Sequence, residues 1–174
     1  TNFYSATLIS FSIVSFYIFP FFITYFLKNK NKFYDEFTYK NIAIFLLFFL
    51  IISFCIMKFT YSGNIGGGIF LKINNLFFDN FYLFYFICYL MIIPITIFFF
   101  NRPENIIIFL IICCTFTSGF FVFQKYFEPM VLIIIVMLTD KEFIRKIIME
   151  NVNLIYIYFI IYNLSYFAYF LKLF

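Results

Sequence analysis

A six-residue polar segment, Gln124–Pro129, separates two apolar segments and holds the residues best suited to chemistry. It reads Gln-Lys-Tyr-Phe-Glu-Pro, so Lys125 and Glu128 carry opposite charges while Tyr126 suits a membrane interface. Ionisable groups near membrane depth are costly unless they pair or face water, and they often mark functional sites. Lys125 could contact a phosphate, with Glu128 holding it in place or orienting a sugar hydroxyl. The alternative is a tight turn whose charged side chains extend to water.

A second candidate site lies in the segment Lys58–Asn80, which holds four of the five glycines. Gly66, Gly67 and Gly68 are consecutive, and a glycine-rich loop lets backbone N–H groups approach a phosphate. No Walker lysine or GxGxxG spacing accompanies them, so a flexible turn is the alternative. Asp79 ends this segment just before an apolar run. There a carboxylate is either a substrate contact or a favourable charge at a helix start.

The composition excludes several kinds of catalytic centre. The chain contains no His, so Ser-His-Asp and Cys-His catalysis cannot be built from its own residues. Its four cysteines lie inside apolar runs without CxxC-type spacing, so neither a zinc site nor a disulfide framework is expected. We therefore expect no metal and no cofactor, and assign no catalytic residue. A third polar segment, Arg102-Pro-Glu104, predicts a tight turn with a local ion pair.

The elements that must position these residues are predicted to be membrane-spanning helices. Of the 174 residues 66% are hydrophobic and 11% are charged, against about 25% charged in soluble domains. A span needs roughly 20 apolar residues. Four runs without a charged residue are close to this length: Phe3–Leu27, Ile42–Met57, Phe81–Phe100 and Val152–Leu171. Pro20 and Pro94 lie inside two of them, where neighbouring groups must satisfy the carbonyl that each proline frees.

The stretch Ile106–Thr139 would be about 51 Å long as one helix, which exceeds a single span. Broken at Gln124–Pro129, it gives two short spans. One side of the membrane then carries eight Lys and Arg residues and the other four, whereas one span gives six and five. Cytoplasmic loops are enriched in Lys and Arg. We therefore predict an all-α polytopic bundle of about six spans, two of them short, with Lys58–Asn80 and Gln124–Pro129 on the external face.

The polar connections divide accordingly. The cytoplasmic segments are predicted to be Lys28–Asn41, Asn101–Asn105 and Asp140–Asn151. The last of these has helical spacing and is either a short interfacial helix or a connecting loop. Ile69–Phe78, which follows the glycines, predicts a short helix lying on the membrane.

Residues 1–174 are thus predicted to form a single transmembrane helical domain. Because the chain starts with Thr1 and has no charged segment before its first apolar run, we expect the C-terminal part of a longer membrane protein. The 34 Phe and 15 Tyr residues, with no Trp, indicate an AT-rich genome. We expect a multi-pass protein of the bacterial inner membrane or an equivalent membrane. The net charge of +4 reports loop topology, not nucleic-acid binding.

The segment Gln124–Pro129 resembles the Arg/Lys-Tyr-x-x-Pro signature near the C-terminal end of polytopic glycosyltransferases of the GT-C type, and related patterns in O-antigen polymerase-like proteins. The resemblance covers six residues and the short flanking helices, and it maps the family's basic, aromatic and proline positions onto Lys125, Tyr126 and Pro129. Lys in place of the commoner Arg loses bidentate phosphate recognition. Such enzymes use polyprenyl-phosphate-linked sugars at the external face, and their catalytic carboxylates usually lie in the first external loop.

The resemblance implies a membrane glycosyltransferase or polysaccharide polymerase, with membrane lipids and a polyprenyl-phosphate-linked sugar as partners. Its substrate-binding residues would be Lys125, Tyr126, Glu128, Gly66, Gly67, Gly68 and Asp79. A transporter, flippase or channel subunit is the main alternative. No charged residue lies well inside the four long apolar runs, which argues against a proton-coupled pump. A small structural subunit of a membrane complex is the third interpretation.

Overall fold

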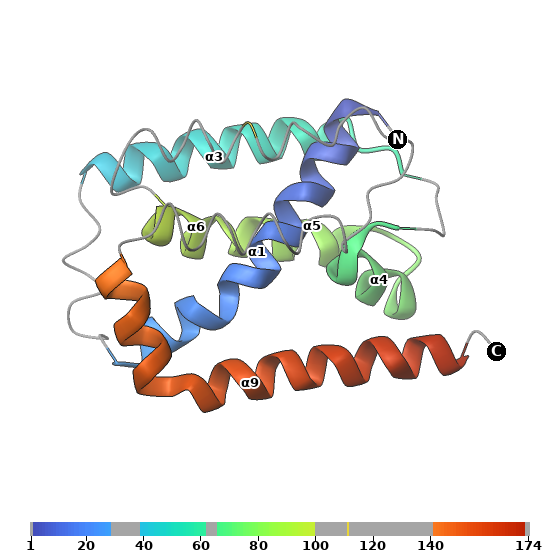
Figure 1. Cartoon of the computed structure of the whole chain (residues 1–174). Helices are drawn as coiled ribbons and strands as arrows, with labels where there is room; N and C mark the ends of the chain where they lie inside the picture. The colour runs from blue at the N-terminus through green and yellow to red at the C-terminus, as the bar shows by residue number, and fades with distance from the viewer. Residues whose placement is uncertain (1, 29–38, 62–65, 100–110, 112–140, 173–174) are drawn as a thin grey trace.

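The computed structural model describes residues 2–28, 39–61, 66–99, 111 and 141–172 (Figure 1). Within these ranges every regular element is an α-helix, which confirms the all-helical prediction for this part of the chain. The helices are α1 (Phe3–Lys28), α3 (Tyr39–Met57), α4 (Gly68–Phe77), α5 (Tyr82–Leu90), α6 (Ile92–Phe99) and α9 (Lys141–Lys172).

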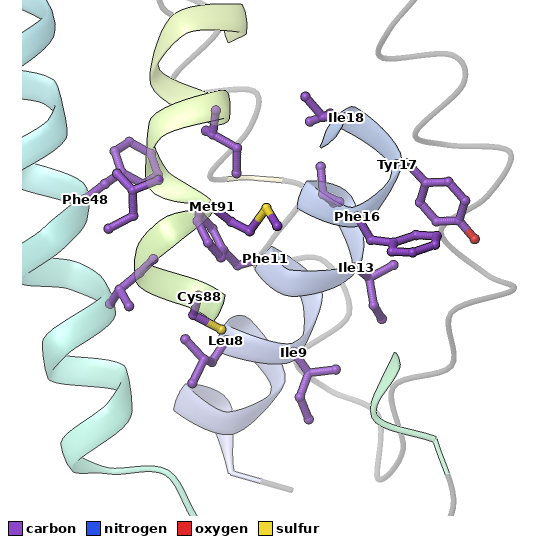
Figure 2. Close-up of a cluster of buried hydrophobic side chains, with 14 of the residues drawn as sticks. Leu8, Ile9, Phe11, Ile13, Phe16, Tyr17, Ile18, Phe48, Cys88 and Met91 are labelled. Atoms are coloured by element: carbon purple, nitrogen blue, oxygen red, sulfur yellow. The ribbon is translucent and has the colours of Figure 1, made fainter. Parts of the chain in front are cut away.

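The first helix, α1, is the centre of the bundle. It contacts α3, α4, α5, α6 and α9, and Figure 1 shows it crossing obliquely among them. Nearly every residue between positions 5 and 18 is buried. In the core, Phe11 of α1 lies near Phe48 of α3 and near Met91 at the junction of α5 and α6 (Figure 2). A helix that is apolar on all sides suits this enclosed position.

Among the described residues, only α1 has both the length and the hydropathy to cross a membrane. Most of α1 is enclosed by protein, and the core helix of a water-soluble protein or a signal sequence would share its length and composition. Shorter apolar helical segments accompany it: Asn41–Met57, Tyr82–Thr96 and Val152–Ser165. The structure therefore supports one helix of spanning length, and six spans stay a prediction.

Contacts between aromatic rings show the directions of the helices. From α1 to α3, Tyr4 packs on Phe54 with ring centroids 5.3 Å apart, and Phe11 lies 6.5 Å from Phe48. The numbering rises in α1 as it falls in α3, so these two helices are antiparallel. From α1 to α9, Phe16 lies 4.9 Å from Tyr162. Figure 1 shows α9 running antiparallel to α1 as well.

The α5–α6 pair returns in the direction of α1. Phe59, just after α3, packs on Phe81 at 5.1 Å, whereas Phe49, earlier in α3, packs on Tyr89 at 4.9 Å. This pairing makes α5 antiparallel to α3 and parallel to α1. Consequently α6 ends, and α9 begins, toward the C-terminal end of α1.

Pro20 interrupts the hydrogen bonding of α1, and a distant residue compensates for it. Proline has no N–H, so Pro20 cannot donate to the carbonyl of Phe16, as residue i does to residue i−4 in a regular helix. The Tyr158 hydroxyl of α9 donates to this carbonyl at 3.1 Å, across 142 sequence positions. The carbonyl of Pro20 in turn accepts from Thr24 Oγ1 at 2.8 Å. The proline is therefore accommodated by a partner on a neighbouring helix, as expected in membrane helices.

Asn2 fixes the start of α1 to the end of α3. Its Oδ1 accepts the Ser5 N–H at 2.8 Å, which is the geometry of an N-cap. Its Nδ2 donates to the carbonyl of Lys58 at 2.8 Å and to Thr60 Oγ1 at 2.9 Å. Ser5 Oγ accepts the Thr60 N–H at 2.9 Å and donates to the Thr60 carbonyl at 3.2 Å. Two short polar side chains thus close this end of the helix pair.

The predicted third span, Phe81–Phe100, is divided into α5 and α6 at Met91. Pro94 accounts for the division, because it cannot donate to the carbonyl of Leu90 and its ring crowds that carbonyl. Pro94 then lies in the first turn of α6, where a missing N–H is tolerated. The sequence placed the proline inside the span without predicting the break.

The two predicted short helices have different outcomes. Ile69–Phe78 is helical as expected, since α4 covers Gly68–Phe77, and its position on a membrane surface stays a prediction. From Lys141 onward, the segment predicted as an interfacial helix or loop is the beginning of α9 and continues into the predicted last span. Figure 1 shows the first turns of α9, in orange, running at a steep angle to its red remainder.

Candidate functional site

Lys125, Tyr126 and Glu128 lie outside the residues that the structure describes, so their predicted site stays a prediction. The glycine triplet and Asp79 are described, and they lie at opposite ends of α4. This helix has ten residues, about 15 Å at 1.5 Å per residue. The structure therefore separates Asp79 from the glycines by roughly the length of the helix.

The glycines form a packed turn at the start of α4. Gly66, Gly67 and Gly68 have φ angles of 87°, 87° and 72°, a region that other residues rarely adopt. Gly67 is buried, and a Cβ there would lie 2.6 Å from Cδ2 of Leu71 and 3.5 Å from Cε1 of Tyr61. Glycine is therefore required at position 67 by its backbone conformation, and any larger residue would also displace the end of the Leu71 side chain. These requirements account for Gly67 without invoking a ligand.

Asp79 is exposed in the bend between α4 and α5, but the structure uses other side chains to close the start of α5. Asn80 Oδ1 accepts the Tyr82 N–H at 3.3 Å. Asn74 Oδ1 accepts the Phe84 N–H at 3.0 Å. Asp79 thus lies just before α5, as predicted, but the acceptors for two of the first N–H groups of α5 are the side-chain oxygens of Asn80 and Asn74.

Asn74 is the fully buried polar residue that joins α4 to α5. Besides accepting from Phe84, its Nδ2 donates to the carbonyl of Asn80 at 2.7 Å and to Asn75 Oδ1 at 3.2 Å. Its own carbonyl accepts the Phe78 N–H at 2.8 Å and ends α4. This side chain therefore joins α4 to the bend and to the start of α5, because its oxygen accepts from Phe84 and its nitrogen donates to the Asn80 carbonyl.

Two ionisable groups near the glycine turn are affected by burial. Lys72 on α4 is half-buried, and loss of hydration lowers the pKa of its ammonium group. Tyr61 is buried, and the same cause raises the pKa of its phenol. Phe70 ties this region to the core, with its ring 5.5 Å from that of Phe16. The region thus combines a packed turn, one amine and one phenol at a single end of the bundle.

Among the side chains that the structure describes, no group of three or more Cys, Asp or Glu could hold a metal ion. The sequence analysis missed Asn2, Asn74 and Tyr158, whose side chains join separate helices. Two sequence features would have pointed to the asparagines: Asn2 stands at the start of an apolar run, and Asn74 lies within a segment predicted to be helical. Nothing in the sequence distinguishes Tyr158 from the other tyrosines in α9.

No family model, curated protein or solved structure matches this chain. The resemblance of Gln124–Pro129 to the glycosyltransferase signature therefore stays a hypothesis based on those residues.

Replacing Asn74 with Ala should lower the free energy of unfolding by about 2–4 kcal/mol. The change removes three side-chain hydrogen bonds and leaves the buried Phe84 N–H without an acceptor. Reversible unfolding of the purified protein in detergent micelles measures the loss. Asn75→Ala is the matched control, because Asn75 is exposed and accepts only the longest of these bonds. Equal losses for the two variants would contradict the role assigned to Asn74.

Proposed function

We propose that this protein is a multi-pass membrane protein in which α1, α3, the α5–α6 pair and α9 are four of six spans. The supporting observation is an exposed apolar surface on the outer helices. On α3 the exposed side chains include Leu46, Leu47, Leu50 and Phe54. Soluble monomers rarely expose apolar surface as one large continuous patch. Hydrocarbon chains of lipid are the environment in which such a helix surface is stable.

The polar side chains support the same placement. Ser12 donates to the Ile9 carbonyl at 2.7 Å, Ser15 to Phe11 at 2.6 Å and Ser53 to Phe49 at 2.7 Å. In each of these the hydroxyl bonds to a carbonyl of its own helix. In hydrocarbon a polar group without a partner is costly, so hydroxyl side chains of this kind suit helices that cross a membrane.

The helix directions support an even number of crossings between α6 and α9. Both α6 ends and α9 begins toward the C-terminal end of α1. The proposal of two short spans within Ile106–Thr139 satisfies this requirement, whereas one span would bring the chain to the opposite side. The external segments would then be Lys58–Asn80, which includes α4, and Gln124–Pro129.

On this topology we propose a transferase acting on polyprenyl-phosphate-linked sugars at the external face. The sequence feature that carries it is the Lys125-Tyr126-x-x-Pro129 signature, which the proposed topology puts in an external turn. The Lys125 ammonium would contact the lipid phosphate, and Glu128 would orient it or a sugar hydroxyl. A positive charge at a phosphoryl oxygen stabilises the charge that develops as a glycosyl phosphate bond breaks.

A transporter is the second candidate, and the interruption at Met91 between α5 and α6 is the observation in its favour, because discontinuous helices line the substrate paths of many transporters. The interruption is slight, since Met91 keeps a right-handed helical backbone and its N–H donates to the Ile87 carbonyl. Thr96 in α6 is buried and already bonds the Ile92 carbonyl at 2.5 Å, so its hydroxyl donor is used within the helix. The predicted spans that contain the described helices carry no charged residue. A hydroxyl that is already bonded and spans without charge offer few contacts for a transported substrate, which favours the transferase.

Single cysteines in a Cys-free background should report the proposed topology. We expect an impermeant thiol reagent applied from outside to label cysteines placed at Asn64 and Gln124, and to leave Asn151 unlabelled until the membrane is opened. Ser10→Cys, buried in α1, is the control for a site that no reagent should reach. Labelling of Asn151 together with Asn64 from outside would contradict an even number of crossings.

Lys125→Ala should lower sugar transfer from a polyprenyl-phosphate donor about 10²-fold or more in membranes containing the full-length protein, because it removes a charge from the phosphate. The measurement is transfer of a radiolabelled sugar, normalised to the amount of inserted protein. Lys125→Arg should retain most activity because it keeps the charge. Lys172→Ala removes a lysine predicted on the same side and should have no effect. Wild-type transfer by Lys125→Ala would remove the proposed phosphate contact.

A further inference from the structure

The outer face of α9 carries a regular line of exposed side chains. These residues are spaced by three, four, three and four positions, which is the spacing of a helix–helix seam. They are Asn153, Tyr156, Ile160, Asn163 and Phe167, and all are exposed. A different face of α9 packs on α1 through Ile155, Tyr158, Phe159 and Tyr162. The seam lies roughly 130° around the helix from that packed face, at 100° per residue, and its side chains stay exposed.

Asn163 is the informative member of this line. It lies near the middle of the predicted span Val152–Leu171, with exposed apolar neighbours Ile160, Leu164 and Phe167. Its Nδ2 donates to the Phe159 carbonyl at 2.9 Å, which uses one of the two N–H groups of the amide. The second N–H of Nδ2 and the oxygen Oδ1 need partners in hydrocarbon, since an unpaired amide group there is costly.

A second copy of this chain would supply such a partner. Two copies inserted with the same topology present α9 in parallel, so identical residues lie at the same depth in the membrane. A side-chain amide is both donor and acceptor, so two Asn163 side chains complement one another across a two-fold axis. Asparagine hydrogen bonds between spans stabilise association, and a single Asn in a seam sets its register.

We propose that the seam of α9 is a homodimer interface in which Asn163 of one protomer pairs with Asn163 of its partner. The inference rests on the membrane placement proposed above, because in water an exposed amide is hydrated and gives no drive to associate. The apolar members of the seam pack around the amide pair. Tyr156 and Phe167 provide the large contacts on either side of it along the helix.

Disulfide crosslinking in native membranes tests the interface. In a Cys-free background, Ile160→Cys lies in the seam, and Ile161→Cys lies about 100° farther around the helix while being equally exposed. Mild oxidation should crosslink Ile160→Cys into dimers and leave Ile161→Cys largely monomeric. Equal crosslinking of both variants would indicate random collision and overturn the proposal.

Co-purification of two differently tagged copies with all native cysteines gives a second measurement. Asn163→Leu should weaken self-association about three- to thirtyfold, the range found for polar contacts between spans. Ser165→Ala is the matched control, since Ser165 is exposed off the seam and bonds its own Ile161 carbonyl. Undiminished association of Asn163→Leu would overturn the pairing. Release of the wild-type chain by alkaline carbonate would instead overturn the membrane placement itself.

Discussion

The hydrogen bond from the Tyr158 hydroxyl to the Phe16 carbonyl is the constraint on which the arrangement of this bundle depends. Pro20 leaves that carbonyl without its regular donor in the middle of the most enclosed helix. A buried carbonyl without a partner costs about 1–3 kcal/mol. The donor must come from a packed neighbour, so α9 is held against α1 at one depth and in one rotation. The rings of Phe16, Tyr158 and Tyr162 fill the space around the bond.

The same principle governs the ends of the helices at the N-terminal end of α1. Helix termini leave N–H groups without partners, and here asparagine side chains supply the acceptors. Asn2 caps α1 and reaches the end of α3, while Asn74 in α4 reaches the start of α5. In a chain with so little charged surface, these amides and hydroxyls provide the specific connections that apolar packing does not. Apolar side chains contribute bulk, and the short polar side chains decide which helix end lies beside which.

The sequence predicted the parts of the fold that depend on local properties. Apolar runs located α1 and α3 to within a few residues, and the spacing after the glycines located α4. It did not predict the break at Met91, because tolerance of Pro94 depends on what packs around Leu90. Nor did it predict that α9 already includes Lys141, because the charged residues in its first turns are equally compatible with a connecting loop. The partner of the Phe16 carbonyl lies 142 residues away, beyond any local pattern. Within the candidate site, spacing along the chain could not show that α4 separates Asp79 from the glycines.

A double-mutant cycle between Pro20 and Tyr158 tests the central claim most directly. Tyr158→Phe in the wild-type background removes the donor and should lower the free energy of unfolding in micelles by about 1 kcal/mol. In Pro20→Ala, the N–H of residue 20 takes the Phe16 carbonyl, so the same Tyr158→Phe change should then cost close to nothing. An equal loss in both backgrounds would show that the Tyr158 hydroxyl does not compensate for the proline.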